Sequence, residues 1–331
     1  MSAAAPLLEV DGLSTVLGST GARILDRISF SLRRGEVLGV VGESGSGKSM
    51  LGLTIMGLLP PVIRRCEGRI VLDGEDLAGL SPKAWRAKRG RDLAMIFQEP
   101  MTALNPVMKV GAQVEEVLVR RRSMSRAAAR EEVVRLFRRV EIPSPERRVA
   151  AYPHEMSGGM RQRVVIAMAL AAQPKLLVAD EPTTALDVTI QAQILDLLRD
   201  LQRDQGLSML LITHDLGVIA ETADRVIVLY AGRVAEIAPV RTLFDAPAHP
   251  YTRALLSSIP KTTGPRHRLV SIEGAVPGVG ALPKGCRFAP RCPFHQPACD
   301  AAAPPLRVVG EGHVVSCILP CSTDRPVGAL A

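Results

Sequence analysis

The stretch GESGSGKS, residues 42–49, decides the fold class of this sequence. It fits the pattern G-x-x-x-x-G-K-[ST], in which glycines let backbone N–H groups curl around phosphate oxygens. The apolar run EVLGVVG leads into it and predicts a buried strand, while KSMLGLTIMGLL continues it as a helix. Because this pattern binds a nucleoside triphosphate when a strand precedes it and a helix follows, we expect an α/β fold with a phosphate loop.

The phosphate loop supplies the first candidate site residues. Lys48 is expected to reach the β- and γ-phosphates and so to take part in catalysis, and Ser49 is expected to bind Mg²⁺. The other positions offer backbone N–H groups to the phosphate oxygens. The candidates for triphosphate binding are Gly42, Glu43, Ser44, Gly45, Ser46, Gly47, Lys48 and Ser49.

Short apolar runs alternate with longer helical ones on both sides of the loop, from residue 35 to residue 230. The runs DLAMIFQ, KLLVADE, SMLLITHD and DRVIVLY each predict a buried strand that ends in polar residues. The alternation is typical of a parallel sheet covered by helices, which binds ligands at the carboxyl ends of its strands. Residues 101–160 interrupt it with helical, arginine-rich sequence, which predicts an inserted helical subdomain.

The run LLVADE, residues 176–181, places two acids at the end of a predicted strand. Asp180 is expected to hold Mg²⁺, and Glu181 to act as the general base on the attacking water. Adjacent acids at a strand end are also found as solvent-facing caps. The phosphate loop upstream favours the catalytic interpretation.

The stretch MSGGMRQR, residues 156–163, opens another helical run. A serine and two glycines at a helix start predict a second anion cradle. With these motifs the chain resembles the ATP-binding cassette ATPases, whose signature is written LSGGQ. The resemblance implies a P-loop NTPase core that uses ATP and Mg²⁺, and a head-to-tail dimer in which the signature of one subunit covers the ATP of a second ATPase subunit. The matching positions are Ser157, Gly158 and Gly159, whereas Met156 and Met160 replace the usual Leu and Gln.

Three further positions match the resembled family. Gln98 ends LAMIFQ, where the family's glutamine contacts the metal and the attacking water. Asp187 ends ALD, residues 185–187, which matches the loop that crosses the dimer interface. His214 ends LLITH and matches the histidine that contacts the γ-phosphate and pairs with the general base. The resemblance thus implies a catalytic set of Glu181, His214, Gln98 and Lys48, and Mg²⁺ ligands Ser49, Gln98 and Asp180.

One feature of the family is missing near the start of the chain. The family stacks adenine on an aromatic residue upstream of the phosphate loop, but this sequence has no Phe, Tyr or Trp before Phe30. Leu17 or a neighbour takes that place. Since a lost ring stack costs about 1 kcal/mol, we expect weakened selectivity for the base.

Longer stretches narrow the resemblance to the ATPase subunits of oligopeptide and dipeptide importers, namely FQEPMTALNP, FDAPAHPYTRALLSSIP and GAVPGVGALPKGCRFAPRCPF. This resemblance implies a nucleotide-binding domain over residues 1–258 and a cysteine-containing extension over residues 259–331. It also implies that ATP hydrolysis drives peptide uptake through two transmembrane permease subunits, with an extracytoplasmic substrate-binding protein as an indirect partner. The subunit would then lie peripherally on the cytoplasmic face of the membrane.

Four cysteines of the extension, Cys286, Cys292, Cys299 and Cys317, follow one another as C-x5-C-x6-C-x17-C. The proline-rich extension can bury little surface of its own, and such segments commonly need a metal. Four thiolates suit a [4Fe–4S] cluster, which some members of the resembled subfamily carry here, but also Zn²⁺. Free thiols, or a redox sensor that gates the ATPase, are the other interpretations. Cys321 could replace Cys317.

Composition leaves one rival function open. The formal net charge of +8 suits nucleic acid or an anionic membrane surface as partner. No apolar run approaches the ~20 residues that span a bilayer, and the first residues do not predict a secretory signal. The rival is a soluble cassette ATPase that acts on nucleic acid or ribosomes. The single cassette and the peptide-importer tail argue against it, so we expect no nucleic-acid partner.

Overall fold

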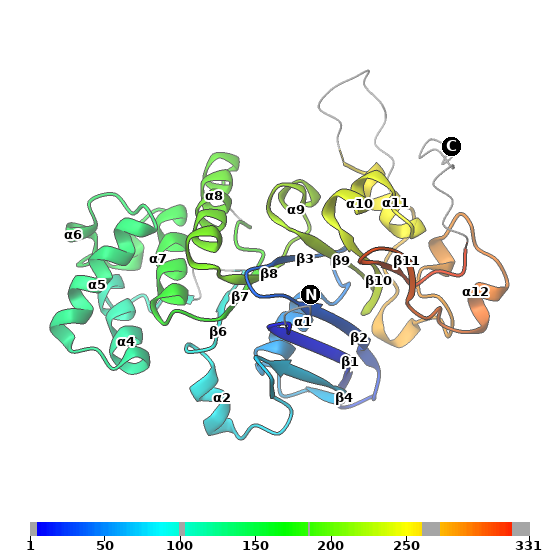
Figure 1. Ribbon diagram of the computed structural model, residues 1–331, viewed down its shortest axis with the longest axis horizontal. Helices are drawn as coiled ribbons and strands as arrows, with labels where there is room; N and C mark the ends of the chain where they lie inside the picture. The colour runs from blue at the N-terminus through cyan, green and yellow to red at the C-terminus, as the bar shows by residue number, and fades with distance from the viewer. Residues whose placement is uncertain (1–4, 99–102, 185, 260–271, 320–331) are drawn as a thin grey trace, which may run out of the picture. The chain divides into compact units, whose positions relative to one another are not determined.

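The computed structural model describes residues 5–98, 103–184, 186–259 and 272–319 (Figure 1). The chain forms two compact units. Unit 1 comprises residues 1–7, 33–36 and 78–211, and unit 2 comprises residues 8–32, 37–77 and 212–331. No helix in the described ranges is both long and apolar enough to cross a membrane.

Unit 1 contains a sheet with the strand order β8-β7-β6, in which β6 and β7 run parallel. Its strands are β6 (Leu93–Ile96), β7 (Leu176–Asp180) and β8 (Ser208–Ile212), of which the last residue belongs to unit 2. In β7 and β8 every residue is buried, as their continuous apolar runs predict for a parallel sheet with both faces covered. The mixed α/β fold expected from the sequence is therefore present.

Most helical elements of unit 1 lie in the predicted helical segment or begin at the signature stretch, whereas α2 and α8 lie outside both. They are α2 (Pro82–Lys88), α4 (Val110–Arg122), α5 (Arg126–Arg139), α6 (Pro145–Arg148), the 3₁₀ turn η1 (Pro153–Glu155), α7 (Gly158–Ala171) and α8 (Val188–Gln205). Helices α4, α5 and α7 pack together. Between α4 and α5, Arg130 pairs with Glu115 and Arg122 with Glu132, so two arginines of this basic run lie in helix–helix ion pairs.

Unit 2 contains an antiparallel sheet with the strand order β2-β1-β4-β5 and a mixed sheet with the order β11-β12-β10-β9-β3. In the mixed sheet β3 and β9 run parallel, and the remaining neighbours are antiparallel. The strands are β1 (Leu8–Leu17), β2 (Arg23–Leu32), β3 (Val37–Val41), β4 (Ile63–Leu72), β5 (Glu75–Asp76), β9 (Arg225–Tyr230), β10 (Arg233–Pro239), β11 (Arg307–Gly310) and β12 (His313–Val315). The helical elements are α1 (Lys48–Ile55), α9 (Leu216–Thr222), α10 (Val240–Asp245), α11 (Pro250–Ser257), η2 (Val279–Ala281), η3 (Ala289–Arg291) and α12 (Ala298–Ala301).

The cysteine-containing tail adds two strands to the mixed sheet. Strand β12 pairs antiparallel with β10, with Glu236 opposite Val315 and Ile237 opposite Val314. Val315 is fully buried, and Phe288 is 2% exposed. The sequence suggested a tail that buries little surface of its own, yet the described part packs into the core of unit 2. The tail therefore shares the core of unit 2 instead of forming a separate one.

A buried carboxylate joins this tail to strand β10. Glu236 is fully buried, and its carboxylate lies 2.7 Å from Nε2 of His313 and accepts hydrogen bonds from the backbone N–H groups of Ala248 and His249. Burial alone would raise the pKa of Glu236, but these hydrogen bonds lower it below the ordinary value. The ionised carboxylate therefore stabilises the fold.

We expect Glu236→Gln to lower the free energy of unfolding by about 2 kcal/mol at pH 7, because charge-assisted hydrogen bonds are lost. The folded pKa lies below the unfolded one, so the contribution of Glu236 is complete above the unfolded pKa and is lost as the pH falls through the folded pKa. Urea unfolding at pH 7 and at successively lower pH should show a shrinking difference from the wild type. Exposed Glu9→Gln on β1 is the control. An equal loss at every pH would contradict this account.

Candidate active site

The phosphate loop of unit 2 leaves β3 at Gly42 and ends where α1 begins at Lys48. Gly42 has a φ of 150°, and a Cβ there would lie 2.2 Å from the carbonyl oxygen of Leu229. Only glycine fits this close approach of the loop to strand β9. The strand, turn and helix predicted from the sequence are all present at this loop.

Two side chains of the loop are suited to binding an anion. Lys48 is 7% exposed, and its ammonium donates hydrogen bonds to the carbonyl oxygens of Gly42 (2.8 Å) and Glu43 (3.1 Å). The hydroxyl of Ser46 is buried and has no hydrogen-bond partner among the described residues. A cradle with a buried cation, an unused hydroxyl and no room for a Cβ fits the phosphates of a nucleotide.

The candidate general base of unit 1 is held by two hydrogen bonds. The carboxylate oxygen Oε2 of Glu181 accepts from Nε2 of Gln98 (3.0 Å) and from the hydroxyl of Thr184 (2.8 Å). Glu181 follows buried β7 with a φ of 47°, a left-handed conformation that costs a non-glycine residue on the order of 1 kcal/mol. Its neighbour Asp180 is 5% exposed and, like Ser49 and Gln98, offers the oxygen donor that Mg²⁺ prefers.

Two residues of this site were missed by sequence reasoning. Thr184 orients Glu181, and Gln162 of α7 donates a 2.6 Å hydrogen bond to the carbonyl oxygen of Pro182. The second bond ties the helix of the signature stretch to the turn that carries Glu181. The run EPTTALD contains Thr184, and a hydroxyl three residues after an acid in a tight turn is a local signal that could have found it.

The signature residues open α7 as expected from the sequence. Ser157 is the N-cap, and its hydroxyl accepts a hydrogen bond from the backbone N–H of Met160 (3.3 Å). Asp187 is the N-cap of α8, and its carboxylate accepts a hydrogen bond from the backbone N–H of Ile190 (2.9 Å). Ser157, Gly158 and Asp187 are exposed, so both helix starts are open to solvent.

The remaining candidate residues are His214, Ala185 and Cys321. His214 is exposed in unit 2, between β8 and α9. Its expected pairing with Glu181 joins residues of different units and stays a prediction. Ala185 and Cys321 lie outside the described residues.

The tail cysteines lie in unit 2. Cys299 and Cys317 are buried, and Cys286 and Cys292 are half-buried. Burial raises the pKa of Cys286 and Cys317, and raises that of Cys292 to about 11. Among the described residues, no group of three or more His, Cys, Asp or Glu side chains is arranged to hold a metal ion. The donor types suit a cluster, but this arrangement does not form one.

Two family models match separate parts of the chain. Residues 25–184 match the model described as ABC transporter, and residues 235–299 match the C-terminal region of oligopeptide/dipeptide transporters. The first range contains the phosphate loop, the signature stretch and Glu181. The second contains three of the four tail cysteines.

Among solved structures, a dimeric ATP-binding cassette bound to ADP and Pi superposes with a TM-score of 0.63 at 28% identity, covering 71% of this chain and 99% of that one. CbiO1 of an ABC transporter complex from Clostridium perfringens gives a TM-score of 0.63 at 29% identity and covers 72% of this chain and 90% of its own.

Sequence relatives cover almost the whole length. The dipeptide transport ATP-binding protein of Bacillus subtilis is 51% identical over 293 residues, 88% of each chain. That of Escherichia coli is 47% identical over 316 residues, 95% of this chain and 97% of its own. A putative peptide import ATP-binding protein of Brucella ovis is 50% identical over 327 residues. The chain therefore belongs to the ABC transporter family of ATP-binding proteins.

Proposed function

We propose that this chain is the ATP-hydrolysing subunit of an importer of dipeptides or oligopeptides. The observation that carries the proposal is the phosphate loop together with Glu181 held by Gln98 and Thr184, in a chain about half identical to dipeptide transport ATP-binding proteins. The rival, a soluble cassette ATPase acting on nucleic acid or ribosomes, is not favoured, because these relatives are named for peptide transport.

In the proposed reaction, ATP binds with its β- and γ-phosphates against the loop at residues 42–49, and Lys48 exchanges its loop carbonyls for phosphate oxygens. Ser49, Gln98 and Asp180 would hold Mg²⁺, which neutralises charge on the phosphates. Glu181 takes a proton from the attacking water, and the hydrogen bonds to its Oε2 fix the orientation of the carboxylate for this step. His214 would contact the γ-phosphate.

Hydrolysis is proposed to occur in a head-to-tail dimer. The exposed helix starts at Ser157 and Asp187 offer N–H groups and side chains to a nucleotide on a second ATPase subunit. Val188, next to Asp187, is 83% exposed, as expected for a surface that a partner covers. The dimeric cassette among the structural neighbours supports this arrangement.

The remaining partners are proposed by similarity to the importer proteins. Two membrane-spanning permease subunits would couple the dimer to transport, a substrate-binding protein would deliver the peptide, and the subunit would sit peripherally on the cytoplasmic face of the membrane. We retain residues 1–258 as the nucleotide-binding domain and residues 259–331 as the extension. Leu17, at the end of β1, would replace the adenine-stacking aromatic and weaken selectivity for the base.

We also propose that Cys286, Cys292, Cys299 and Cys317 are ligands of an iron–sulfur cluster, or failing that of Zn²⁺. The support is chemical: four thiols lie within one small segment, and each type of metal accepts four thiolates. Since the described arrangement does not itself form a metal site, binding would require the thiols to rearrange and to lose their protons.

The function is tested with Glu181→Gln. This variant should bind Mg·ATP as tightly as the wild type but hydrolyse it at least about 10²-fold more slowly, because the amide cannot accept the proton of the attacking water. Calorimetric titration with ATP and phosphate release measure the two effects. Lys48→Ala is the contrasting variant and should lose binding as well. Normal turnover by Glu181→Gln would remove this residue from the mechanism.

Thr184→Val should lower kcat for ATP about tenfold with KM unchanged, because the hydroxyl acts only through the orientation of Glu181. Thr184→Ser keeps the hydroxyl and is the matched control, expected to retain most of the activity. Steady-state kinetics over a range of ATP concentrations separate kcat from KM. A rise in KM with kcat preserved would assign Thr184 to binding instead.

Protein purified without oxygen should contain about four iron and four sulfide per chain if the tail holds a [4Fe–4S] cluster. Cys292→Ser should lose them, because one of the four thiolate ligands is removed. Metal analysis together with the visible absorption spectrum decides, and one zinc per chain would select the alternative ligand. Absence of both metals from the native complex would overturn the proposed ligand set.

A further inference from the structure

The phosphate loop contains a carboxylate of its own. Glu43 is the second residue of the loop, and its backbone N–H donates a 2.8 Å hydrogen bond to the hydroxyl of buried Tyr251. A negative side chain beside an anion cradle repels the phosphates unless a cation compensates it. The source of that cation decides how well the loop accepts a triphosphate.

The compensating cation comes from the tail. Arg291, at the end of η3, forms two parallel hydrogen bonds with Glu43, from Nη1 to Oε2 at 2.7 Å and from Nη2 to Oε1 at 3.0 Å. The side chain of Arg291 is 5% exposed and that of Glu43 is 28% exposed. A two-pronged pair of this kind fixes orientation as well as charge. The hydrogen bond to Glu43 raises the pKa of Arg291 above its ordinary value.

The guanidinium of Arg291 is held from its other sides as well. Nε donates to the carbonyl oxygen of Glu273 (2.8 Å), Nη2 to that of Ile272 (3.1 Å), and Nη1 to the hydroxyl of Tyr230 (3.2 Å). Together with the two bonds to Glu43, these contacts occupy all five N–H donors of the side chain. The tail therefore presents a fixed cation to the loop.

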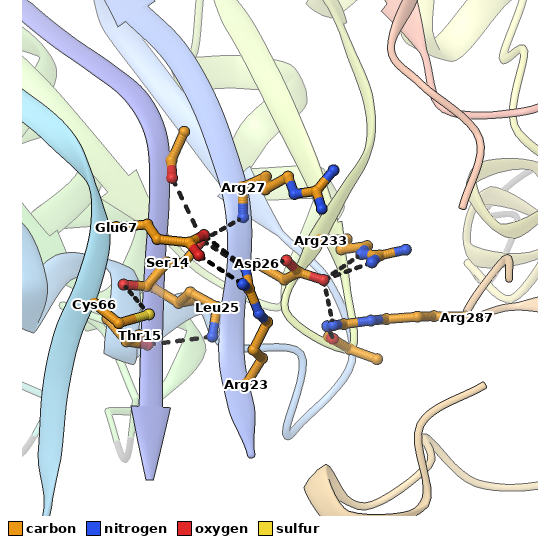
Figure 2. Close-up of polar contacts among 12 residues, drawn as sticks. Ser14, Thr15, Arg23, Leu25, Asp26, Arg27, Cys66, Glu67, Arg233 and Arg287 are labelled. Carbon is orange, nitrogen blue, oxygen red and sulfur yellow. Dashed lines mark hydrogen bonds and ion pairs between the residues drawn. The ribbon is translucent and has the colours of Figure 1, made fainter. Parts of the chain in front are cut away.

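A second arginine of the same tail segment supports the opposite end of the loop. Figure 2 shows that Arg287 donates a hydrogen bond to the carboxylate of Asp26, which also accepts a hydrogen bond from Arg233. Arg287 donates to the carbonyl oxygen of Ala231 as well. The next residue, Gly232, donates its N–H to the carbonyl oxygen of Ser46 in the loop at 2.8 Å.

Gly232 packs closely against the backbone of strand β2, where no side chain would fit. It has a φ of 80°, and a Cβ there would lie 1.8 Å from the carbonyl oxygen of Ile24. Its own carbonyl oxygen accepts from the N–H of Asp26 at 2.9 Å. The segment between Cys286 and Cys292 thus supports the phosphate loop at both Glu43 and Ser46.

We propose that Arg291 is a positioning residue for ATP: it cancels the charge of Glu43 and holds its carboxylate in one orientation, so that the tail sets the affinity of the phosphate loop. The inference rests on the proposed ATPase function and deepens it. Loss of Arg291 leaves an unpaired carboxylate beside the triphosphate, which opposes ATP binding in the ground state and the transition state alike. The effect therefore falls on the dissociation constant and KM rather than on kcat.

The test measures Mg·ATP binding by calorimetry and steady-state hydrolysis on the full chain. Arg291→Gln should raise the dissociation constant and KM about tenfold while kcat stays within about twofold. Adding Glu43→Gln to Arg291→Gln should restore most of the affinity, because the uncompensated charge is removed. Arg291→Lys keeps the charge without the paired hydrogen bonds, so its affinity for Mg·ATP should fall about threefold.

Arg307→Gln is the matched control, because the tail arginine Arg307 donates to carbonyl oxygens of Cys317 and Leu319. It should lower the melting temperature and leave ATP affinity unchanged. If Arg291→Gln binds ATP like the wild type, or if the double variant is as weak as Arg291→Gln, the inference is overturned. Should Arg291→Gln fail to fold, wild-type affinity in Arg291→Lys overturns it equally. Failure of the wild type to bind ATP would instead overturn the proposed function.

Discussion

The close approach of the phosphate loop to strand β9 is the constraint on which unit 2 depends. A Cβ at Gly42 would lie 2.2 Å from the carbonyl oxygen of Leu229, and Ser46 accepts a hydrogen bond from Gly232, just after the same strand. The loop is thus fixed by the β9–β10 hairpin at both ends. Because β10 in turn pairs with β12 of the tail, residues near the C-terminus contribute to the geometry of a loop near the N-terminus.

Three aromatic side chains of unit 2 pack together next to residues that contact the phosphate loop. Tyr230, Tyr251 and Phe288 come from β9, α11 and the tail, and their ring centroids are 4.6 to 5.3 Å apart. Aromatic residues are scarce in this chain, at 3% of the sequence, and none precedes Phe30 where an adenine ring would be stacked. Two of the three tyrosines instead contact the residues around Glu43. The hydroxyl of Tyr251 accepts a hydrogen bond from the backbone N–H of Glu43, and the hydroxyl of Tyr230 accepts one from Arg291. Three of the ten Phe, Tyr and Trp residues of the chain therefore pack together next to residues that contact the phosphate loop.

Local patterns predicted the parts of the fold that are local. The phosphate loop, the buried strands and the helix start at Ser157 each depend on residues within one short window, and they are present where the sequence placed them. The contact of Arg291 with Glu43 spans 248 positions and carries no local signal. The pairing of β12 with β10 was missed for the same reason, since a three-residue strand in a proline-rich tail has no clear periodicity. Glu181 was predicted from the LLVADE run and Gln98 from the family pattern, but their direct hydrogen bond was not predicted.

Two of the tail cysteines are sequence neighbours of the arginines that contact the phosphate loop and its support. Cys286 precedes Arg287, and Cys292 follows Arg291, so the two arginines that support the phosphate loop are covalent neighbours of two of the four thiols. A ligand that gathered these thiols would act on the backbone that carries both arginines. Coupling of this kind is reciprocal for binding: if a tail ligand changed ATP affinity by some factor, ATP would change the affinity for the tail ligand by the same factor. Under the proposed ligand set, the short turn between Cys286 and Cys292 would then couple the binding of the tail ligand to the binding of ATP.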